Sequence, residues 1–220
     1  MSIPFYFAME ESEAAPPHGS RVAQLGFGFQ EDGTLRLPAR RLPGAPAVIN
    51  DRFLPAKAPE PAVLDRLAEV CGNGCFLDFE RAINEIGAAI AVGLRQRLNE
   101  KMTVPSALHR LCPDADVQIP GLLCNNWESF VRRVQANYGD RWALEVIPWD
   151  NHIEMPYLAA QDGCLQTAVC HYRVKTGGVH YYDTEETIRQ KLAVAERYGC
   201  QAGIILLREF KQIPRFGETD

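Results

Sequence analysis

Short apolar runs, without a helical period, mark the first sixty residues. Residues 3–8 and 22–29 predict two strands, and residues 47–50 predict a short third one. Residues 30–46 are rich in Pro, Gly and Arg and show no period, which predicts a loop. No helix is therefore expected between the first three strands.

Helical spacing begins near residue 60 and then alternates with strands. Val63, Leu64, Leu67 and Val70 fall on one face of a helix that follows a proline-rich start. The later pattern predicts strands at 74–80, 102–106, 142–148, 165–172 and 202–207, helices at 83–98, 127–138 and 185–198, and a loop at 107–126.

Eight predicted strands and this alternation indicate an α/β fold, a compact (β/α)₈ barrel over residues 1–220 as a single domain. A full barrel usually takes about 250 residues, so the helices after the first strands are expected to be reduced. A doubly wound open sheet is the competing architecture, but it normally has helices between its early strands as well.

Residues 73–80, Asn-Gly-Cys-Phe-Leu-Asp-Phe-Glu, form the stretch with the most chemical content. On a strand, Phe76, Asp78 and Glu80 share one face, while the residues between them share the other. Two carboxylates at the end of an apolar strand are costly unless they face a cavity. Strand ends at the C-terminal mouth of a barrel commonly hold such catalytic groups.

This stretch resembles the signature of the family 18 glycoside hydrolases, the chitinase and chitinase-like barrels, Asp-Gly-x-Asp-x-Asp-x-Glu on the fourth strand. Gly74, Asp78 and Glu80 match it. Residues 182–191 and 198–204 are similar to the family's final helix and eighth strand, and residues 146–150 resemble its sixth-strand pattern Met-x-Tyr-Asp.

The resemblance implies a role for each matched residue. Glu80 would be the general acid on the glycosidic oxygen, and Asp78 would orient the substrate's own 2-acetamido group, which is the nucleophile in this family. Trp149 and Asp150, after the sixth predicted strand, would contact the substrate. Tyr172, at the end of the seventh, and Tyr6, on the first, complete the expected substrate-binding set.

The expected activity is substrate-assisted, retaining hydrolysis of N-acetylated amino-sugar polymers such as chitin or peptidoglycan. The alternative is a non-catalytic, chitinase-like glycan-binding protein. Phe76 in place of the middle Asp, and Leu207 in place of the eighth-strand Trp, favour the alternative, while the retained Glu80 favours the enzyme. A third reading is an unrelated barrel hydrolase that uses Asp78 and Glu80 on a metal, and a purely structural role for both carboxylates is the plain alternative.

The composition limits the classes of molecule that the chain is expected to bind. A net charge of -5 without a basic run argues against nucleic acid or an anionic membrane, which leaves a carbohydrate as the expected ligand. Seven scattered cysteines without a CxxC pair, and histidines without ligand spacing, predict no metal or other cofactor. Without a basic leader or a membrane-spanning run, a cytoplasmic location is expected, with spore association as a further possibility.

Overall fold

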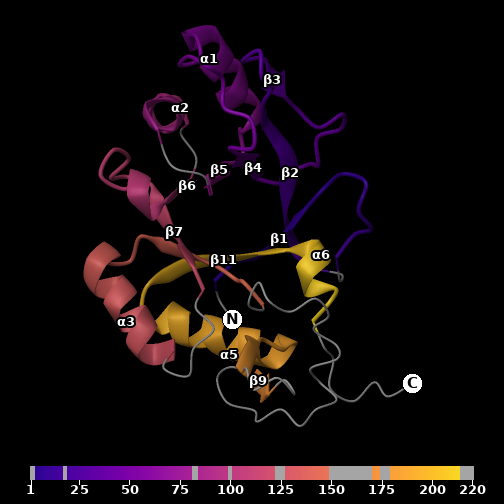
Figure 1. Cartoon of the computed structure of the whole chain (residues 1–220), viewed down its shortest axis with the longest axis vertical. Helices are drawn as coiled ribbons and strands as arrows, with labels where there is room; N and C mark the ends of the chain where they lie inside the picture. The colour runs from indigo at the N-terminus through magenta and orange to yellow at the C-terminus, as the bar shows by residue number, and fades with distance from the viewer. Residues whose placement is uncertain are drawn as a thin grey trace. The chain divides into compact units, whose positions relative to one another are not determined.

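The computed structural model describes residues 3–16, 19–80, 84–98, 101–121, 127–148, 170–173 and 179–213. The strands are β1 (Phe5–Met9), β2 (Arg21–Phe29), β3 (Leu35–Arg36), β4 (Ala47–Asn50), β5 (Cys75–Asp78), β6 (Met102–Pro105), β7 (Asp116–Pro120), β8 (Trp142–Glu145), β9 (Cys170–Arg173), β10 (Val179–Tyr182) and β11 (Cys200–Leu206). The helices are α1 (Pro61–Val70), α2 (Glu85–Arg95), the 3-10 turn η1 (Ser106–Leu108), α3 (Trp127–Tyr138), α5 (Glu185–Arg197) and α6 (Leu207–Phe210) (Figure 1).

The strand order defines the fold. The strands are hydrogen-bonded in the order β1-β11-β8-β7-β6-β5-β4-β2, and β1 also pairs with β2, so eight strands form a closed ring; β3 adds antiparallel to the edge of β2. The pairs β1–β2, β2–β4, β4–β5, β5–β6, β6–β7 and β8–β11 are parallel. Helices intervene from β4 onward. The predicted (β/α)₈ barrel with reduced helices after its first strands is confirmed.

Two strand assignments made from the sequence are wrong. The sixth barrel strand is β7, which lies inside the predicted loop 107–126. Its residues alternate polar and apolar as a strand should, but flanking prolines and Gly121 obscured that alternation. The strand Trp142–Glu145 is therefore the seventh, and residues 146–150 follow the seventh strand and not the sixth.

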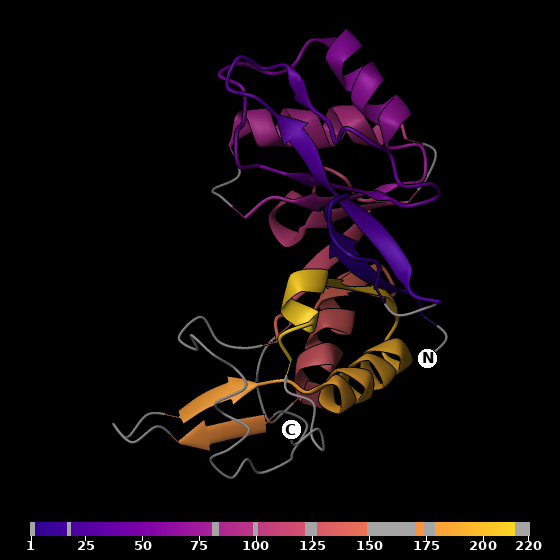
Figure 2. The same ribbon diagram turned by 90° about the vertical axis from the view of Figure 1, so that its right-hand side faces the viewer.

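The segment predicted as the seventh strand, 165–172, is the second correction. Its described end belongs to β9, which pairs antiparallel with β10 in a separate two-stranded sheet (Figure 2). Tyr172 lies on β9, and Tyr181 and Tyr182 lie on β10; aromatic residues of this kind are common in strands, whether in a hairpin or in a barrel. Residue type alone could not distinguish the two.

The chain divides into two compact units, residues Tyr6–Ile119 in the first, and residues Met1–Phe5 with Pro120–Asp220 in the second. In the first unit, α1 and α2 pack against each other and cover the outward face of β4 and β5 (Figure 1). In the second, α3 and α5 pack together beside β8 and β11. The single domain over residues 1–220 stays a prediction.

Gly74 determines where β5 begins. It adopts a φ of +91°, a conformation that side chains rarely tolerate, and a Cβ atom there would lie 2.5 Å from the carbonyl oxygen of Lys101. That carbonyl accepts a hydrogen bond from the Cys75 amide at 3.1 Å, and the Gly74 carbonyl accepts one from Ala47 at 3.0 Å. Only glycine lets the chain turn into the strand with both neighbours this close.

We expect Gly74→Ala to lower the free energy of unfolding by more than the strain of its φ alone, which is about 1–3 kcal/mol. Gly44→Ala is the matched control, because Gly44 has a φ of +71° but a Cβ atom there would have no neighbour within 4 Å. Urea unfolding of both variants measures the difference. Equal losses would show that the approach of Lys101 relaxes at no cost.

A buried ion pair anchors α5 in the second unit. The Lys191 Nζ lies 2.8 Å from Asp183 Oδ2, and the two side chains are 5% and 2% exposed. Thr187 donates to the other carboxylate oxygen at 2.9 Å, and the Lys191 ammonium lies 5.1 Å from the ring centroid of Trp127. Burial raises the pKa of Asp183, and the Lys191 charge offsets part of that rise.

The backbone of Asp183 is also hydrogen-bonded to a residue far away in the sequence. Its backbone amide donates to the carbonyl of Pro148 at 2.6 Å, so two residues that are far apart in the sequence lie side by side. Strands β9 and β10 lie between these two residues in the sequence (Figure 2).

Lys191→Met should lower the free energy of unfolding by about 3–5 kcal/mol at about pH 7, because it leaves the carboxylate of Asp183 buried without a cation. The folded pKa of Asp183 then rises further above 3.8. A raised carboxyl pKa contributes stability that is present at low pH and lost as pH rises through the folded pKa, so the loss should be smaller near about pH 4.

The double variant Asp183→Asn/Lys191→Met is the control for this pH dependence, because it removes the titrating carboxyl. Chemical unfolding at both pH values checks the prediction. An equal loss for Lys191→Met at both would contradict the assignment of the effect to an unpaired carboxylate.

Candidate active site

The candidate acids lie at the C-terminal end of β5, as the sequence predicted. Asp78 is the last residue of the strand and is half-buried, while Glu80 follows two residues later and is exposed. The alternate residues Cys75, Leu77 and Phe79 are buried in the core beneath α1 and α2. Asp78 therefore lies on the opposite, inward face of the strand, while Glu80 lies just beyond the strand end, which the sequence had predicted at residue 80.

Neighbouring strands place further polar groups at the level of Asp78. Asn50, the last residue of β4, is its register partner, and the register through β6 puts Gln118 of β7 at the same level. The Asn50 side-chain oxygen accepts from the Arg52 amide at 3.1 Å. A Cβ at Gly28 would meet the Asn50 carbonyl at 3.2 Å, so the backbone of β2 approaches this level closely.

An aromatic layer lies one level below the acids. Phe76 is 5% exposed, and its ring meets that of Tyr6 from β1 edge-on, with centroids 5.5 Å apart and planes at 66°. An edge-to-face contact of this kind is favourable beyond the area that it buries. The position of the family's middle Asp is thus filled by packed aromatic rings, and Asp78 has no carboxylate beneath it on its own strand.

Of the other four predicted site residues, the structure describes Tyr6 and Tyr172. Tyr6 is half-buried in this layer, and its contact with substrate stays a prediction. Trp149 and Asp150 lie outside the described residues. Tyr172 lies on β9, opposite His180, in the hairpin and not at the end of a barrel strand. The predicted shared rim of Trp149, Asp150, Tyr172 and Glu80 stays a prediction.

The described part of the chain contains neither a cluster of metal ligands nor a helix that could span a membrane. There, no three histidine, cysteine, aspartate or glutamate side chains converge as a metal site would require, so the metal-dependent reading gains no support from it. No helix within the same residues is long and apolar enough to cross a bilayer.

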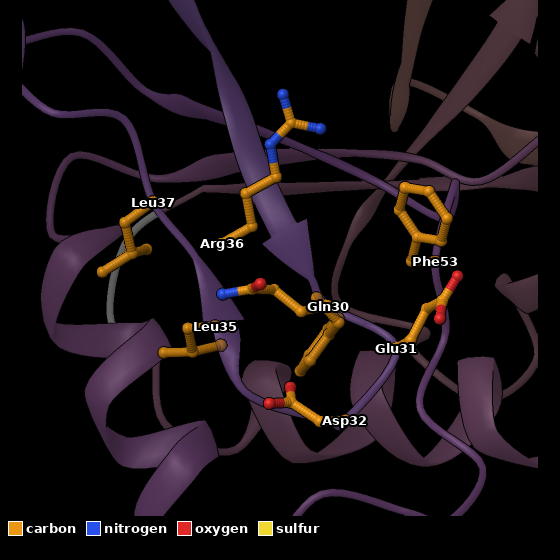
Figure 3. A pocket seen from close by; sticks show the side chains of 8 residues that line it. Gln30, Glu31, Asp32, Leu35, Arg36, Leu37 and Phe53 are labelled. Carbon is orange, nitrogen blue, oxygen red and sulfur yellow. The ribbon is translucent and has the colours of Figure 1, made fainter.

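The sequence did not reveal every polar residue of this region. Asn50 ends a strand that was predicted with its correct bounds, so its position at the mouth could have been inferred. Gln118 was missed because its strand was taken for a loop. A groove of about 750 Å³ beside the β2–β3 turn was also missed, since most of the residues that line it lie in the predicted loop 30–46 (Figure 3).

Comparison with solved structures identifies two proteins of similar fold, both spore cortex-lytic enzymes named SleL. The Bacillus cereus protein has a TM-score of 0.57 at 12% sequence identity, over 92% of this chain and 70% of that one. The Bacillus megaterium protein has a TM-score of 0.55 at 13% identity, with the same coverage. At such identity the likeness shows the barrel fold. No protein-family model and no curated protein sequence matches the chain.

The aromatic layer can be tested by a double-mutant cycle on Tyr6→Leu and Phe76→Leu. We expect a coupling energy of about 0.5–1.5 kcal/mol in the free energy of unfolding, because the edge-to-face contact is lost only once. Tyr6→Phe should keep most of the coupling, since it keeps the ring. Simple additivity of the two leucine variants would mean that the rings do not support each other.

Proposed function

We propose that the chain is a glycoside hydrolase of the family 18 type, acting on N-acetylated amino-sugar polymers or oligomers. The observation that carries the proposal is the position of Asp78 at the C-terminal end of the fourth barrel strand, with Glu80 two residues further on. That is the edge of a barrel where catalytic side chains lie. The match to the family signature supports the roles, and the fold likeness to two spore cortex-lytic enzymes supports a cell-wall glycan as substrate class.

The proposed reaction assigns one step to each carboxylate. Glu80, protonated, gives its proton to the glycosidic oxygen as the bond to the anomeric carbon breaks. The carbonyl oxygen of the substrate's 2-acetamido group attacks that carbon from the other side and forms a cyclic cation. Asp78 orients the acetamido group and stabilises the positive charge that develops on it. Water then attacks the anomeric carbon and opens the cyclic cation, and Glu80 accepts a proton from that water. The configuration at the anomeric carbon is retained.

Exposure suits the two roles. Glu80 is exposed, so it can reach the oxygen of a bound polymer. Asp78 is half-buried above the Phe76 ring, where a carboxylate acts more strongly on a nearby cation than it would in bulk water. With an aromatic residue in place of the middle Asp, Asp78 has no acidic partner on its own strand.

Glu80→Gln should lower turnover of a chromogenic N-acetylglucosaminide by about 10²–10⁴-fold, because the leaving oxygen then has no acid. Asp78→Asn should also slow turnover, by leaving the acetamido group poorly oriented. Glu69→Gln is the matched control: the same substitution on the exposed face of α1, where Glu69 pairs with Arg66, should leave the rate unchanged.

The corresponding glucoside, which lacks the acetamido group, tests substrate assistance and should not be hydrolysed. Equal turnover of both sugars would exclude it. No turnover of either, together with measurable binding of N-acetylated oligomers, would support the second candidate function, a glycan-binding protein. The observation that favours that candidate is the aromatic packing of Tyr6 on Phe76, at the level where the family has an acid.

A further inference from the structure

Asn50 places a carboxamide beside Asp78 at the C-terminal ends of the strands. It is the last residue of β4 and the register partner of Asp78 on β5, and such neighbouring strands are about 5 Å apart. Ala47 and Ile49 lie in the core with α1 and α2, which leaves Asn50 on the inward face that Asp78 also occupies. The reaction proposed above gives this residue no role.

The side-chain amide of Asn50 has one defined orientation. Its Oδ1 atom accepts a hydrogen bond from the Arg52 amide at 3.1 Å, which identifies that atom as the oxygen, since an N–H donor requires an acceptor. A Cβ atom at Gly28 would lie 3.5 Å from Oδ1 and 4.0 Å from Cγ, so the oxygen occupies the space that the missing side chain of β2 leaves open. The Nδ2 atom is not among the three nearest atoms, and it therefore lies farther from β2 than the oxygen does.

The nitrogen of this amide is therefore directed toward β5. Strand β4 lies between β2 and β5 in the sheet, and the two branches of a planar carboxamide diverge from its carbon. Among the residues that the structure describes, Nδ2 donates to no protein acceptor, whereas Oδ1 is engaged. Because Asn50 is half-buried and its orientation is defined, its two N–H groups face the space next to the Asp78 carboxylate.

A donor at this position complements the two candidate acids. An ionised carboxylate only accepts hydrogen bonds, so Asp78 can hold the N–H of the substrate's acetamido group but cannot hold an oxygen of the sugar ring. Glu80 gives its proton to the glycosidic oxygen in the proposed reaction. The Nδ2 group of Asn50 thus stays available for a substrate oxygen beside the acetamido group.

The position of the acetamido group on the ring selects that oxygen. The group is attached to C2, whose neighbours are C1, the reacting carbon, and C3, which carries an oxygen. The carbonyl oxygen of the acetamido group is itself used in the attack on C1. We infer that Asn50 is a substrate-contacting residue whose Nδ2 group donates to the C3 oxygen, while Asp78 accepts from the acetamido N–H. This inference rests on the proposed function and adds the residue that selects for an oxygen at C3.

A cycle that combines a protein variant with a substrate analogue tests the contact. The substrates are a chromogenic N-acetylglucosaminide and its 3-deoxy analogue, which lacks the C3 oxygen. The wild-type protein should prefer the first by about three- to tenfold in kcat/KM, the value of one hydrogen bond between neutral groups. Asn50→Ala should remove that preference, because it slows only the sugar that has the oxygen. Equal slowing of both sugars would show a purely structural role and overturn the inference.

Asn50→Ser separates the contact with substrate from the turn at Arg52. A serine hydroxyl can still accept from the amide two residues further on, but it is shorter than the asparagine amide and ends below the substrate. This variant should unfold at nearly the wild-type urea concentration and still lose the preference, so a preference that survives in it would overturn the inference. Asn137→Ala is the matched control and should keep the preference, because Asn137 is exposed on α3.

The same cycle in binding separates this inference from the proposed hydrolysis. Isothermal titration of the Glu80→Gln protein with the two sugars, with and without Asn50→Ala, measures the preference without turnover. If the wild type hydrolyses neither sugar but Asn50→Ala removes a binding preference for the C3 oxygen, the contact is supported and the hydrolysis is overturned. If the wild type hydrolyses both sugars at equal kcat/KM, the contact is overturned and the hydrolysis is supported.

Discussion

One face of strand β5 packs in the apolar core under α1 and α2, and the position of both candidate acids depends on that packing. Cys75, Leu77 and Phe79 are 2%, 0% and 7% exposed in the core under α1 and α2. A shift of the strand by one residue would exchange the faces and put Asp78 among those apolar side chains. The resulting desolvation of a carboxylate would far exceed the cost of a lost backbone hydrogen bond. The packing of the outward face thereby fixes the chemistry of the inward face.

Much of this arrangement could be predicted from the sequence, because local pattern and packing agree there. Residues 47–50 were predicted with the bounds that β4 has, and the face assignment of Asp78 follows from the period of two alone. The strand assignments are wrong where the local sequence pattern is typical of a different structure. The prolines around β7 are typical of a loop, and the aromatic residue of β9 is typical of strands both inside and outside a barrel. The groove at Phe53 is lined mostly by residues 29–37, and residues 30–46 were predicted only as a loop.

The aromatic layer changes how the matched signature should be interpreted. In a row of acids along one strand, each carboxylate influences the charge of the next. Here the ring of Phe76, packed on Tyr6, separates Asp78 from the interior of the barrel. The lateral neighbour of Asp78 is Asn50, a neutral residue that can donate and accept hydrogen bonds but does not titrate. Both the residue below Asp78 on its own strand and its register partner on β4 are therefore uncharged.

The hydrogen bond from Asp183 to Pro148 has a consequence for the entropy of folding. It joins the backbones of two residues that are 183 − 148 = 35 positions apart in the sequence. The entropy of closing such a loop grows only slowly with its length. A contact across 35 positions therefore costs little more chain entropy than one across half that number, and the buried pair of Asp183 and Lys191 adds its own stabilisation at the same end of the loop.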